Sequence, residues 1–380
     1  MADSHKSTVS QLSEPDTNST KNFPIQIVDS ATKHGVGIIA SRDIEKNELV
    51  FAECPVLRVA LANDEDSSLI ILTDDEKIWV DGYCRATSSA NSSTPSDPVK
   101  TFAENSFKKV KIAFNEIQNQ SEKDAIFALH DVFSAGENSF SFGKKTLFGI
   151  YQTNCLSDHI QTSDNETGVL CPIASRFNHS CTPNLFVFPA DEGTTSSSSS
   201  SSVATDHPGT NNSSNFCEQR FFATRDIKAG EELFHSYVDP EAPRNERRNT
   251  LEKAYRFVDD DSGATNYSND SDSRRMRIRE LRKQLVSTEE DEEEAQRISA
   301  QSKLQNSIPE LFDLLRLEKL ENPFTIATIS FYAFDLARIV GDFEAAKMWI
   351  DKAISNFKIL SLGIESEQIL ELKELRDIFP

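Results

Sequence analysis

The sequence predicts an α+β fold, in which a domain rich in short β-strands carries a helical insertion and is followed by a helical domain. Three observations lead to this prediction. Short apolar runs broken by Gly, Asn and Pro fill residues 23–59, as in successive short strands. Apolar residues recur at helical spacing within 61–145, and the same period returns from Asn306 to the end of the chain. Strands therefore form the first domain, and helices interrupt and follow it.

The composition is that of a globular, acidic protein. With 61 Asp and Glu against 40 Lys and Arg, the formal net charge is −21, and 37% of the residues are hydrophobic. This charge argues against a nucleic-acid partner, because phosphate contacts need clustered Lys and Arg. An acidic surface instead attracts basic partners. The sequence shows neither an 18-residue apolar run nor an N-terminal hydrophobic signal segment, so we expect no membrane partner and a cytoplasmic or nuclear location.

The chain opens on the predicted β-rich domain, residues 23–257. Residues 1–22 are polar and lack periodicity, which predicts a disordered tail. In the strands that follow, Gly35 and Gly37 flank Val36 and would let the backbone approach a ligand closely, because glycine has no Cβ. A plain β-turn explains the same two glycines, and the residues alone leave that alternative open.

The helical insertion is predicted over residues 61–145. Thr73 to Glu76 forms a capping-box pattern in front of an apolar run, which marks the start of a helix. Further helices are predicted over 98–117 and 121–133 from the spacing of their apolar residues. The insertion therefore splits the β-rich domain into two stretches of sequence.

A dense polar turn, Arg176–Asn184, precedes a run of β-branched and aromatic residues typical of a strand. Its asparagine, histidine and cysteine side chains offer enough donors and acceptors to hold a polar ligand. Other interpretations are open. Asn178-His179-Ser180 is formally a glycosylation sequon. His179 and Cys181 could be metal ligands, although no second pair stands at zinc spacing, and His179 beside Ser180 could suggest a base and a nucleophile.

The remaining segments follow in order. Low-complexity sequence over 190–215 predicts a flexible loop at a hairpin tip. Residues 258–300 hold acidic and basic blocks and are predicted to be a charged linker with a basic helical stretch over Arg274–Val286, whose opposite charges pair with each other. Residues 301–380 are predicted to be a helical domain. Gly341–Trp349 resembles the second helix of a tetratricopeptide-like pair, and an ordinary helical bundle explains the pattern at least as well.

The polar turn resembles the R-x-x-N-H-S-C-x-P-N core of SET-domain lysine methyltransferases, and other segments follow in that family's order. Residues 33–44 resemble the N-terminal cofactor strand, and Gly230–Tyr237 resembles the catalytic-tyrosine segment. Residues 148–154 resemble the G-I-x-x-T-N segment of fungal SET proteins related to the MYND-containing type. The resemblance implies a SET domain with its pseudoknot. It also implies a protein-lysine methyltransferase that uses S-adenosyl-L-methionine.

The resemblance further implies roles for individual residues. Tyr237 matches the catalytic tyrosine, whose hydroxyl orients the amine and the methyl group and whose ring helps to wall the lysine channel. Tyr255 resembles an aromatic residue of that channel, although simple packing explains it equally well. The cofactor-binding positions that the resemblance implies are Gly35, Val36, Gly37, Asn178, His179 and Phe257, the last with the same packing alternative.

Two neighbouring polar residues have other expected roles. His235 matches no motif and is expected to be a surface or core histidine. Asn154 ends the G-I-x-x-T-N segment and is expected to support the residues that contact a ligand. If the resemblance holds, the segments at Gly35, Asn178 and Tyr237 meet around a single cavity, although they are far apart in the sequence.

The chain departs from its zinc-binding relatives at two places. The cysteines and histidines of a MYND finger are absent, and Val258-Asp259-Asp260-Asp261 stands where relatives continue with C-x-C. We therefore expect no bound metal. This departure favours an alternative function, a catalytically inactive SET scaffold that acts in protein–protein interaction. The intact motifs favour the enzyme, with a basic protein such as a histone or a ribosomal protein as its substrate.

Overall fold

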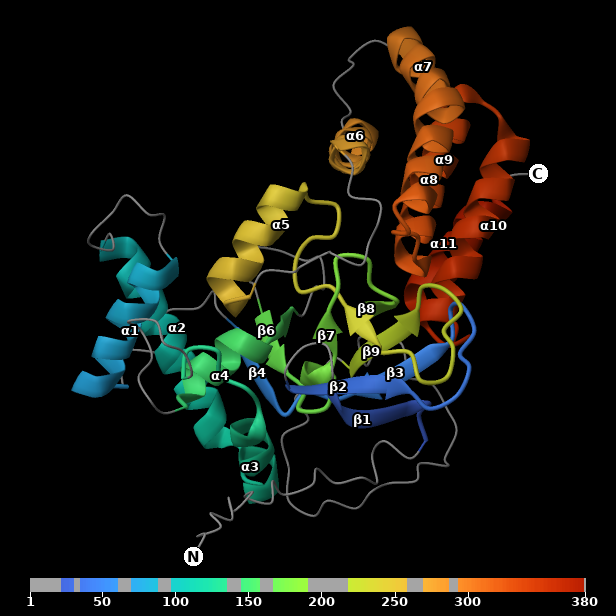
Figure 1. Cartoon of the computed structure of the whole chain (residues 1–380). Coiled ribbons are helices and arrows are strands. Elements are labelled where there is room, and N and C mark those ends of the chain that lie inside the picture. The colour runs from blue at the N-terminus through green and yellow to red at the C-terminus, as the bar shows by residue number, and fades with distance from the viewer. Residues whose placement is uncertain are drawn as a thin grey trace, which may run out of the picture.

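The computed structural model describes residues 22–30, 35–60, 70–87, 97–134, 145–157, 167–190, 218–257, 269–286 and 293–378. The predicted tail and the predicted low-complexity loop lie outside these residues, apart from Asn22 and Ala190 at their borders. Small sheets lie at the centre of the molecule, with helices of the insertion on one side and the C-terminal helices on the other (Figure 1). The predicted α+β class is confirmed.

The strands of the described residues are short and belong to four small sheets. Such short segments follow from the sequence, in which Gly, Asn and Pro interrupt each apolar run after a few residues. Two sheets have two strands each, the antiparallel pair β1 (Ile25–Ser30) and β2 (Gly35–Ala40) and the parallel pair β7 (Asn178–His179) and β10 (Phe234–His235). The other two have three strands each, in the orders β3 (Leu49–Glu53), β9 (Glu218–Ala223), β8 (Leu185–Ala190) and β4 (Leu57–Ala60), β6 (Thr167–Leu170), β5 (Leu156–Ser157).

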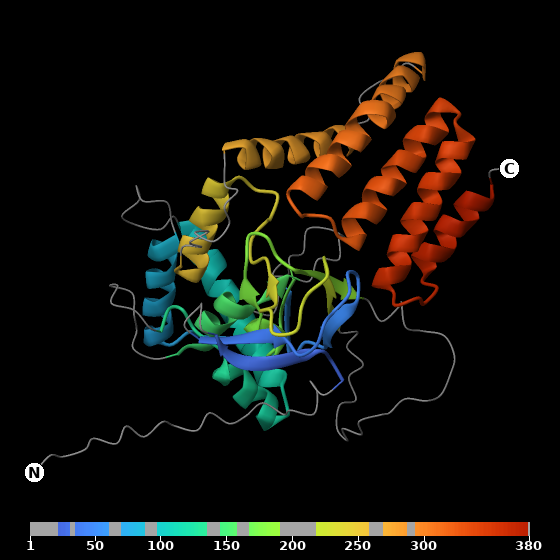
Figure 2. The ribbon, with the colours of Figure 1, turned by 45° about the vertical axis from the view of Figure 1, so that its right-hand side comes forward.

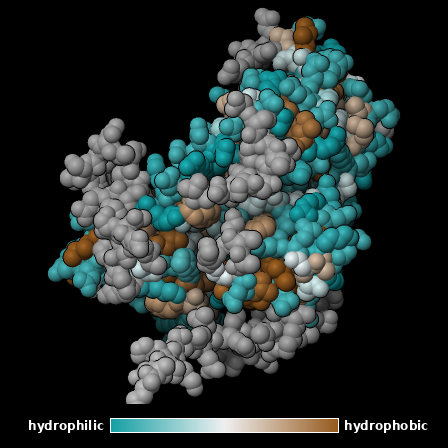
Figure 3. All heavy atoms as spheres, in the orientation of Figure 1, coloured by the Kyte–Doolittle hydropathy of each residue, from teal (hydrophilic) through white to brown (hydrophobic). Residues whose placement is uncertain are grey.

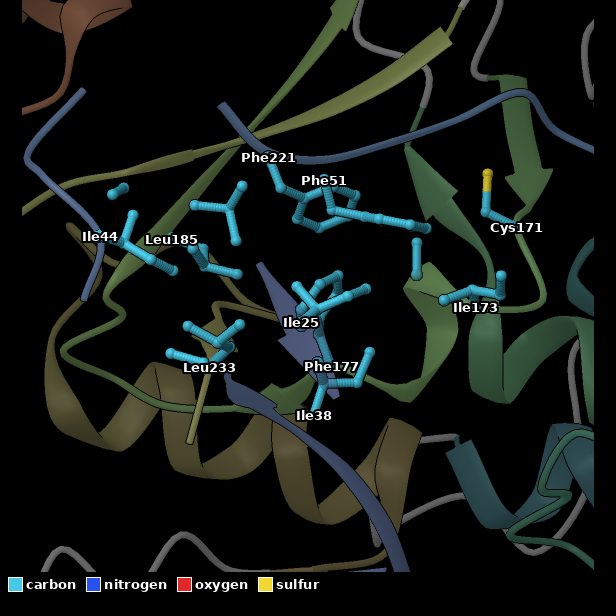
Figure 4. Packing of buried hydrophobic residues seen from close by; sticks show 14 of the residues in the cluster. Ile25, Ile38, Ile44, Phe51, Cys171, Ile173, Phe177, Leu185, Phe221 and Leu233 are labelled. Atoms are coloured by element: carbon cyan, nitrogen blue, oxygen red, sulfur yellow. The ribbon is translucent and has the colours of Figure 1, made fainter. Parts of the chain in front are cut away.

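The core between these sheets is aromatic. Phe177 of the polar turn contacts Phe221 at 4.8 Å and Phe51 at 5.9 Å between ring centroids. Figure 4 shows these rings in one cluster with Ile38 and Leu233. A fully buried side chain of this size contributes about 1.5–3 kcal/mol. Packing therefore fixes the polar turn against β3 and β9, and brings β2 and the segment before β10 to the same core.

The described residues between 70 and 134 are largely helical, and the capping box at the start of the first helix is present. The backbone N–H of Thr73 donates to Glu76 Oε2 at 2.7 Å, and that of Glu76 donates to Thr73 Oγ1 at 3.3 Å. Trp79 is buried in a second hydrophobic cluster, which the insertion shares with β4 and β6. The helices are α1 (Asp74–Thr87), α2 (Asp97–Glu116), α3 (Gln120–Ala128) and α4 (Leu147–Asn154).

Helices also make up the described chain after β10. A short helix and one turn of π-helix follow the strand and lead to Arg256, which has a left-handed φ of 59°. The bounds of the segments are α5 (Arg244–Thr250), the π-helical turn Leu251–Tyr255, α6 (Asn269–Val286), α7 (Glu293–Ser302), a second π-helical turn Lys303–Ser307, α8 (Ile308–Leu317), α9 (Pro323–Val340), α10 (Phe343–Leu360) and α11 (Glu367–Asp377).

Within residues 258–300, predicted to be a charged linker with a helical stretch over Arg274–Val286, the structure places the helices α6 and α7. Ile278, Leu281 and Leu285 recur on one face of α6 and are buried in the core of the helical domain. The surrounding Arg, Lys, Asp and Ser residues hid this narrow apolar stripe in the composition. The predicted pairing of charges within the segment is largely wrong, because several arginines of α6 pair with carboxylates elsewhere in the chain.

Helices α9 and α10 form a hairpin at the centre of the helical domain. The Asn322 side chain caps α9 by accepting a hydrogen bond from the Thr325 N–H at 2.9 Å. Gly341 ends α9 with a φ of 86°, a conformation that glycine adopts without a Cβ clash, and α10 begins two residues later. By length and composition, Pro323–Val340 could cross a membrane, but 50% of this window is buried inside the protein.

The helical domain packs directly on the β-rich domain. Phe222 is buried in a cluster with Phe334 of α9 and Ile350 of α10, and Phe186 and Phe188 of β8 pack against the same cluster. Figure 2 shows the C-terminal helices standing beside the sheets, with α6 lying between them and α5. On the face seen in Figure 3, hydrophilic residues dominate and the apolar ones form small separate patches. The apolar side chains are thus concentrated in the interior and between the two domains.

Candidate active site

The three segments singled out in the sequence meet in the structure. Strand β7, which is Asn178 and His179, pairs in parallel with Phe234 and His235 of β10. The backbone N–H of Leu233, next to β10, donates to the Ile38 carbonyl of β2 at 2.8 Å. The glycine strand, the polar turn and the tyrosine segment are therefore linked by backbone hydrogen bonds at one place.

Asn178 joins the polar turn to the other two segments through its side chain. Its Nδ2 donates to Glu232 Oε1 at 2.7 Å and lies 3.5 Å from the Val36 carbonyl oxygen. Asn184, at the far end of the turn, is buried and bonds to the segment that contains Glu232 and Phe234. Its Nδ2 donates to the Glu232 carbonyl at 2.9 Å, and its Oδ1 accepts from the Phe234 N–H at 2.8 Å. The two asparagines thus fix where the segments cross.

His179 positions the backbone of Tyr237. Its Nδ1 accepts a hydrogen bond from the Tyr237 N–H at 3.0 Å, so the neutral imidazole carries its proton on Nε2. Nε2 lies 3.4 Å from the sulfur of Cys181, which also accepts from Arg247 Nε at 3.3 Å. In the described part of the chain, no three His, Cys, Asp or Glu side chains are grouped so as to hold a metal ion.

The alternative in which His179 acts as a base for Ser180 does not fit this geometry. The acceptor nitrogen of His179 is engaged by the Tyr237 N–H, and the Ser180 hydroxyl accepts from the Thr182 N–H at 3.1 Å. Because a base needs a free acceptor within reach of the hydroxyl it activates, these neighbours do not form a nucleophilic pair.

Tyr237 is the residue on which the site converges. Its hydroxyl donates to the Phe177 carbonyl at 2.7 Å, which turns the phenol inward toward the polar turn. Its ring lies 4.9 Å from the rings of His235 and Tyr255 and 5.3 Å from that of His179, between centroids. Burial raises the pKa of Tyr237 well above its ordinary value, and the neighbouring Tyr255 adds to this effect. Tyr237 is therefore a neutral phenol at physiological pH.

His235 was expected to be a surface or core histidine, and it is buried next to Tyr237. Burial, together with the nearby His179, lowers the pKa of His235 to about 3. The imidazole therefore stays uncharged at neutral pH and behaves as part of an aromatic wall. No sequence motif pointed to this placement, which follows from His235 ending β10 two residues before Tyr237.

Tyr255 and Phe257 join the same aromatic group. The ring of Phe257 lies 6.0 Å from His179, and that of Tyr255 lies 4.9 Å from Tyr237. Arg256 between them has the left-handed backbone conformation noted above, which turns the chain at this point. Both residues thus pack against Tyr237 and its neighbours, as either the functional or the packing interpretation requires.

A cavity of about 670 Å³ opens beside Tyr237 and extends between the two domains. Asn178, His179 and Phe257 are not among its walls, although they contact Tyr237 or its neighbours. Tyr237 therefore has the cavity on one side and the Asn178 side of the site on the other. The walls include the aromatic group (His235, Tyr237, Tyr255), the segment after it (Asp239, Pro240, Glu241), strand β8 (Leu185–Pro189) and the helical domain (Lys319, Leu320, Asn322, Phe324, Thr325).

Asn154 lines this cavity and also has a supporting role, as expected. Its Nδ2 donates to the carbonyls of His130 at 2.6 Å and Ile150 at 2.7 Å, and its own carbonyl accepts from the Ser175 hydroxyl at 3.1 Å. These bonds tie the end of α4 to the start of the polar turn.

Sequence reasoning missed Glu53, at the end of β3. Its carboxylate accepts from the backbone N–H groups of Ala174 at 2.7 Å and Ile173 at 3.1 Å, just before the polar turn. Desolvation raises the pKa of Glu53 to about 7, against the opposing effect of these hydrogen bonds and of Arg176. Nothing in the local sequence marks Glu53, because its partners are about 120 residues away.

Comparisons with known proteins match this geometry to one family. The model of the SET domain matches residues 35–238, which is more than half of the chain. SET domain-containing protein L678 of Acanthamoeba polyphaga mimivirus is 26% identical over 231 residues, covering 59% of this chain and 71% of the viral protein. Two solved structures also align. The SET domain of LSMT bound to lysine and AdoHcy covers 94% of this chain and 92% of that one (15% identity, TM-score 0.30), and Rubisco LSMT bound to AdoMet covers 93% and 92% (13%, 0.27).

Proposed function

Because this chain belongs to the SET-domain family, whose model spans residues 35–238, we propose that it transfers a methyl group from S-adenosyl-L-methionine to the ε-amine of a lysine in a protein substrate. The observation that carries the proposal is the convergence of the glycine strand, Asn178 and His179 with the segment of Tyr237, which itself lines a cavity. Each of these residues was singled out by its motif before its position was known.

The Asn178 side of the site fits the cofactor. A Cβ placed on Gly35 would meet no atom of the described residues within 4 Å, apart from its chain neighbours, so this part of the structure leaves open space beside the strand for a ligand. The Val36 carbonyl, the Asn178 side chain and the ring of Phe257 beside His179 supply polar and aromatic contacts around it. When bound, the cofactor supplies an electrophilic methyl group. The residues proposed to hold it are Gly35, Val36, Gly37, Asn178, His179 and Phe257.

The cavity side of Tyr237 fits the lysine. The hydroxyl of Tyr237 donates its proton to the Phe177 carbonyl, so its oxygen lone pairs remain able to accept an N–H from the substrate amine. This contact, with the ring of Tyr255 at 4.9 Å, would aim the amine across Tyr237. Such positioning accounts for most of what an in-line displacement requires of a protein.

The amine must also be uncharged to react. An ordinary lysine has a pKa near ~10.4, and desolvation between aromatic rings lowers it. His235, with its pKa of about 3, adds no competing charge and is too weak a base to take the proton. The proton therefore leaves to solvent as the side chain enters, and the aromatic walls favour the neutral amine that remains.

The acidic surface supports a basic protein as substrate, such as a histone or a ribosomal protein, in the cytoplasm or nucleus. The cavity supports a polypeptide rather than a small molecule, because its walls continue from Tyr237 onto β8 and the helical domain. The helical domain would thus contribute directly to recognition of the residues around the target lysine.

The test is incubation of the purified protein with labelled S-adenosyl-L-methionine and two acceptors, core histones and ribosomal proteins. We expect label on lysine with the wild type and a large loss with Tyr237→Phe. Absence of transfer to either acceptor, together with absence of S-adenosylhomocysteine binding in calorimetry, would contradict the proposal.

The second candidate, an inactive SET scaffold, is favoured by one observation. Val258-Asp259-Asp260-Asp261 lacks the thiolates that bind zinc in the relatives this chain resembles. Calorimetry with S-adenosylhomocysteine separates the two candidates. The enzyme should release heat that Asn178→Ala abolishes, whereas the scaffold should release none in either protein.

A further inference from the structure

Four consecutive residues that follow Tyr237 and Val238 are each held by an arginine. Arg279 pairs with the Asp239 carboxylate, Arg275 Nη1 donates to the Pro240 carbonyl, and Arg282 pairs with Glu241 at 2.8 Å. Arg247 of α5 donates to the Ala242 carbonyl. Guanidinium groups suit this role, because they are always charged and their planar forks hold oxygen atoms in fixed directions.

Three of the four arginines come from one face of α6. Arg275, Arg279 and Arg282 are spaced by four and three residues, which places them in a row along a helix. Figure 2 shows α6 lying across the molecule between α5 and α8, so its face runs past the segment they bind. We call these three residues the arginine row.

The arginine row is anchored at its other end in the helical domain. Arg275 is 1% exposed, and its Nε donates to Glu318, directly after α8, at 3.0 Å. Glu318 also accepts from the Ser271 hydroxyl at 2.6 Å and pairs with Arg274. Because a buried charge is costly unless it is paired, the pair with Glu318 holds the Arg275 side chain in this position. The Pro240 carbonyl is therefore held against a rigid, buried network.

The segment that the row holds belongs to the active site. Asp239, Pro240 and Glu241 line the cavity together with Tyr237, two to four residues away. His179 fixes the backbone of Tyr237 from the other side. No cysteine stands between residues 218 and 380. The arginine row supplies ionic cross-links to the segment after Tyr237.

We propose that Arg275, Arg279 and Arg282 are positioning residues for Tyr237, which fasten the edge of the substrate cavity to the helical domain. The proposal rests on the methyltransferase function proposed above. None of the three arginines lines the cavity. The row holds the segment that follows Tyr237, and a displacement of about 1 Å at a reacting group can cost roughly 10²-fold in rate.

The chain offers a matched control on the same helix. Arg277 has the same exposed side-chain fraction as Arg279, 37%, and it also bonds two carboxylates. Its partners are Glu280 of α6 and Glu310 of α8, so it links helices to each other without touching the segment after Tyr237. Arg277→Gln therefore removes a comparable set of ion pairs away from the site.

The main experiment compares the double variant Arg279→Gln/Arg282→Gln with Arg277→Gln, using core histones as acceptor. We expect kcat to fall by about tenfold to 10²-fold in the double variant, while the Kd for S-adenosylhomocysteine stays within about twofold. The control should stay within about twofold in both. Equal kcat in the double variant and the control would overturn the proposal.

Two further measurements separate positioning from general loss of structure. Hydrogen–deuterium exchange should speed up in peptides covering residues 236–243 of the double variant and not of the control. Charge reversal at the Arg282–Glu241 pair should reduce kcat in either single variant, Arg282→Glu or Glu241→Arg, and restore much of it when the two are combined. A fall in kcat with unchanged exchange, or no restoration in the combined variant, would overturn the proposal.

The exchange measurement also keeps this proposal distinct from the proposed function. If the wild type transfers no methyl group and binds no cofactor, the function proposed above fails. Faster exchange over 236–243 in the double variant alone would then still show that the row fastens this segment, and equal exchange in all variants would show that it does not.

Discussion

The backbone N–H of Tyr237 donates a hydrogen bond to Nδ1 of His179 at 3.0 Å, across 58 residues of sequence. This bond gives His179 of the polar turn a structural role. It holds the peptide that carries Tyr237, while the Tyr237 hydroxyl bonds back to the Phe177 carbonyl two residues before His179. Together the two hydrogen bonds tie the polar turn to the segment of Tyr237, so neither segment can shift without the other.

Replacing His179 should therefore damage both stability and activity. In His179→Leu the Tyr237 N–H loses its acceptor, and leaving a buried donor unpaired costs about 1–3 kcal/mol. His179→Asn keeps an acceptor at the position of Nδ1 and should recover much of that loss. Urea unfolding of the three proteins measures the effect. Equal destabilisation by Leu and Asn would mean that the hydrogen bond is not what the histidine provides.

Removing only the hydroxyl of Tyr237 tests its role more narrowly. Tyr237→Phe keeps the ring contacts with His235 and Tyr255 and loses the hydrogen bond to Phe177, so the free energy of unfolding should fall by about 1 kcal/mol. Methyl transfer should fall by roughly 10²-fold or more, as when one positioned hydrogen-bonding group is removed from an active site. Calorimetry with S-adenosylhomocysteine serves as the control and should show nearly unchanged affinity. Wild-type kcat in this variant would remove Tyr237 from the mechanism.

Asn184 should matter as much for folding as the residues of the site. Asn184→Ala removes one bond to the Glu232 carbonyl and one from the Phe234 N–H, both at a buried crossing of chains. Two buried groups left unpaired cost about 2–4 kcal/mol together. Thr182→Ala, an exposed position in the same turn, should change the free energy of unfolding by less than about 0.5 kcal/mol. A small effect at both positions would show that the crossing does not depend on Asn184.

Glu53 should make stability depend on pH. Its pKa is about 7 in the folded protein and about 4.5 when unfolded, so between these values only the folded state retains the proton. The free energy of unfolding therefore falls as pH rises from about 4.5 to 7, by about 3 kcal/mol in all, and stays low above that range. Glu53→Gln should lack this decline. Parallel curves for the two proteins in urea titrations from pH 5 to 8 would contradict the assignment.

The sequence was sufficient to find the segments of the site but not the contacts that lock them. Gly35, Asn178 and Tyr237 lie in short patterns, and these patterns predicted that their segments would meet. Glu53, Glu232 and Asn184 were not assigned roles, because each acts on a backbone or side-chain group far away in the sequence. A pattern within a segment holds no information about such partners until the fold brings them together.

The error over α6 has the same origin. Its arginines, taken within the segment, suggest a solvated stretch whose charges balance against neighbouring acidic runs. Their actual partners include Asp239, Glu241 and Glu318, and the buried stripe that orients the helix holds only a few apolar residues. Both features become visible only when the helical domain and the segment after Tyr237 are seen side by side.

The pairing of Arg275 with Glu318 has a consequence for biosynthesis. The two residues are 43 positions apart, and Glu318 is made later. When α6 emerges from the ribosome, Glu318, the buried counter-charge of Arg275, has not yet emerged. The segment after Tyr237 can reach its final position only once α8 has emerged, so a chain terminated before residue 318 would contain every SET motif and still lack a finished site.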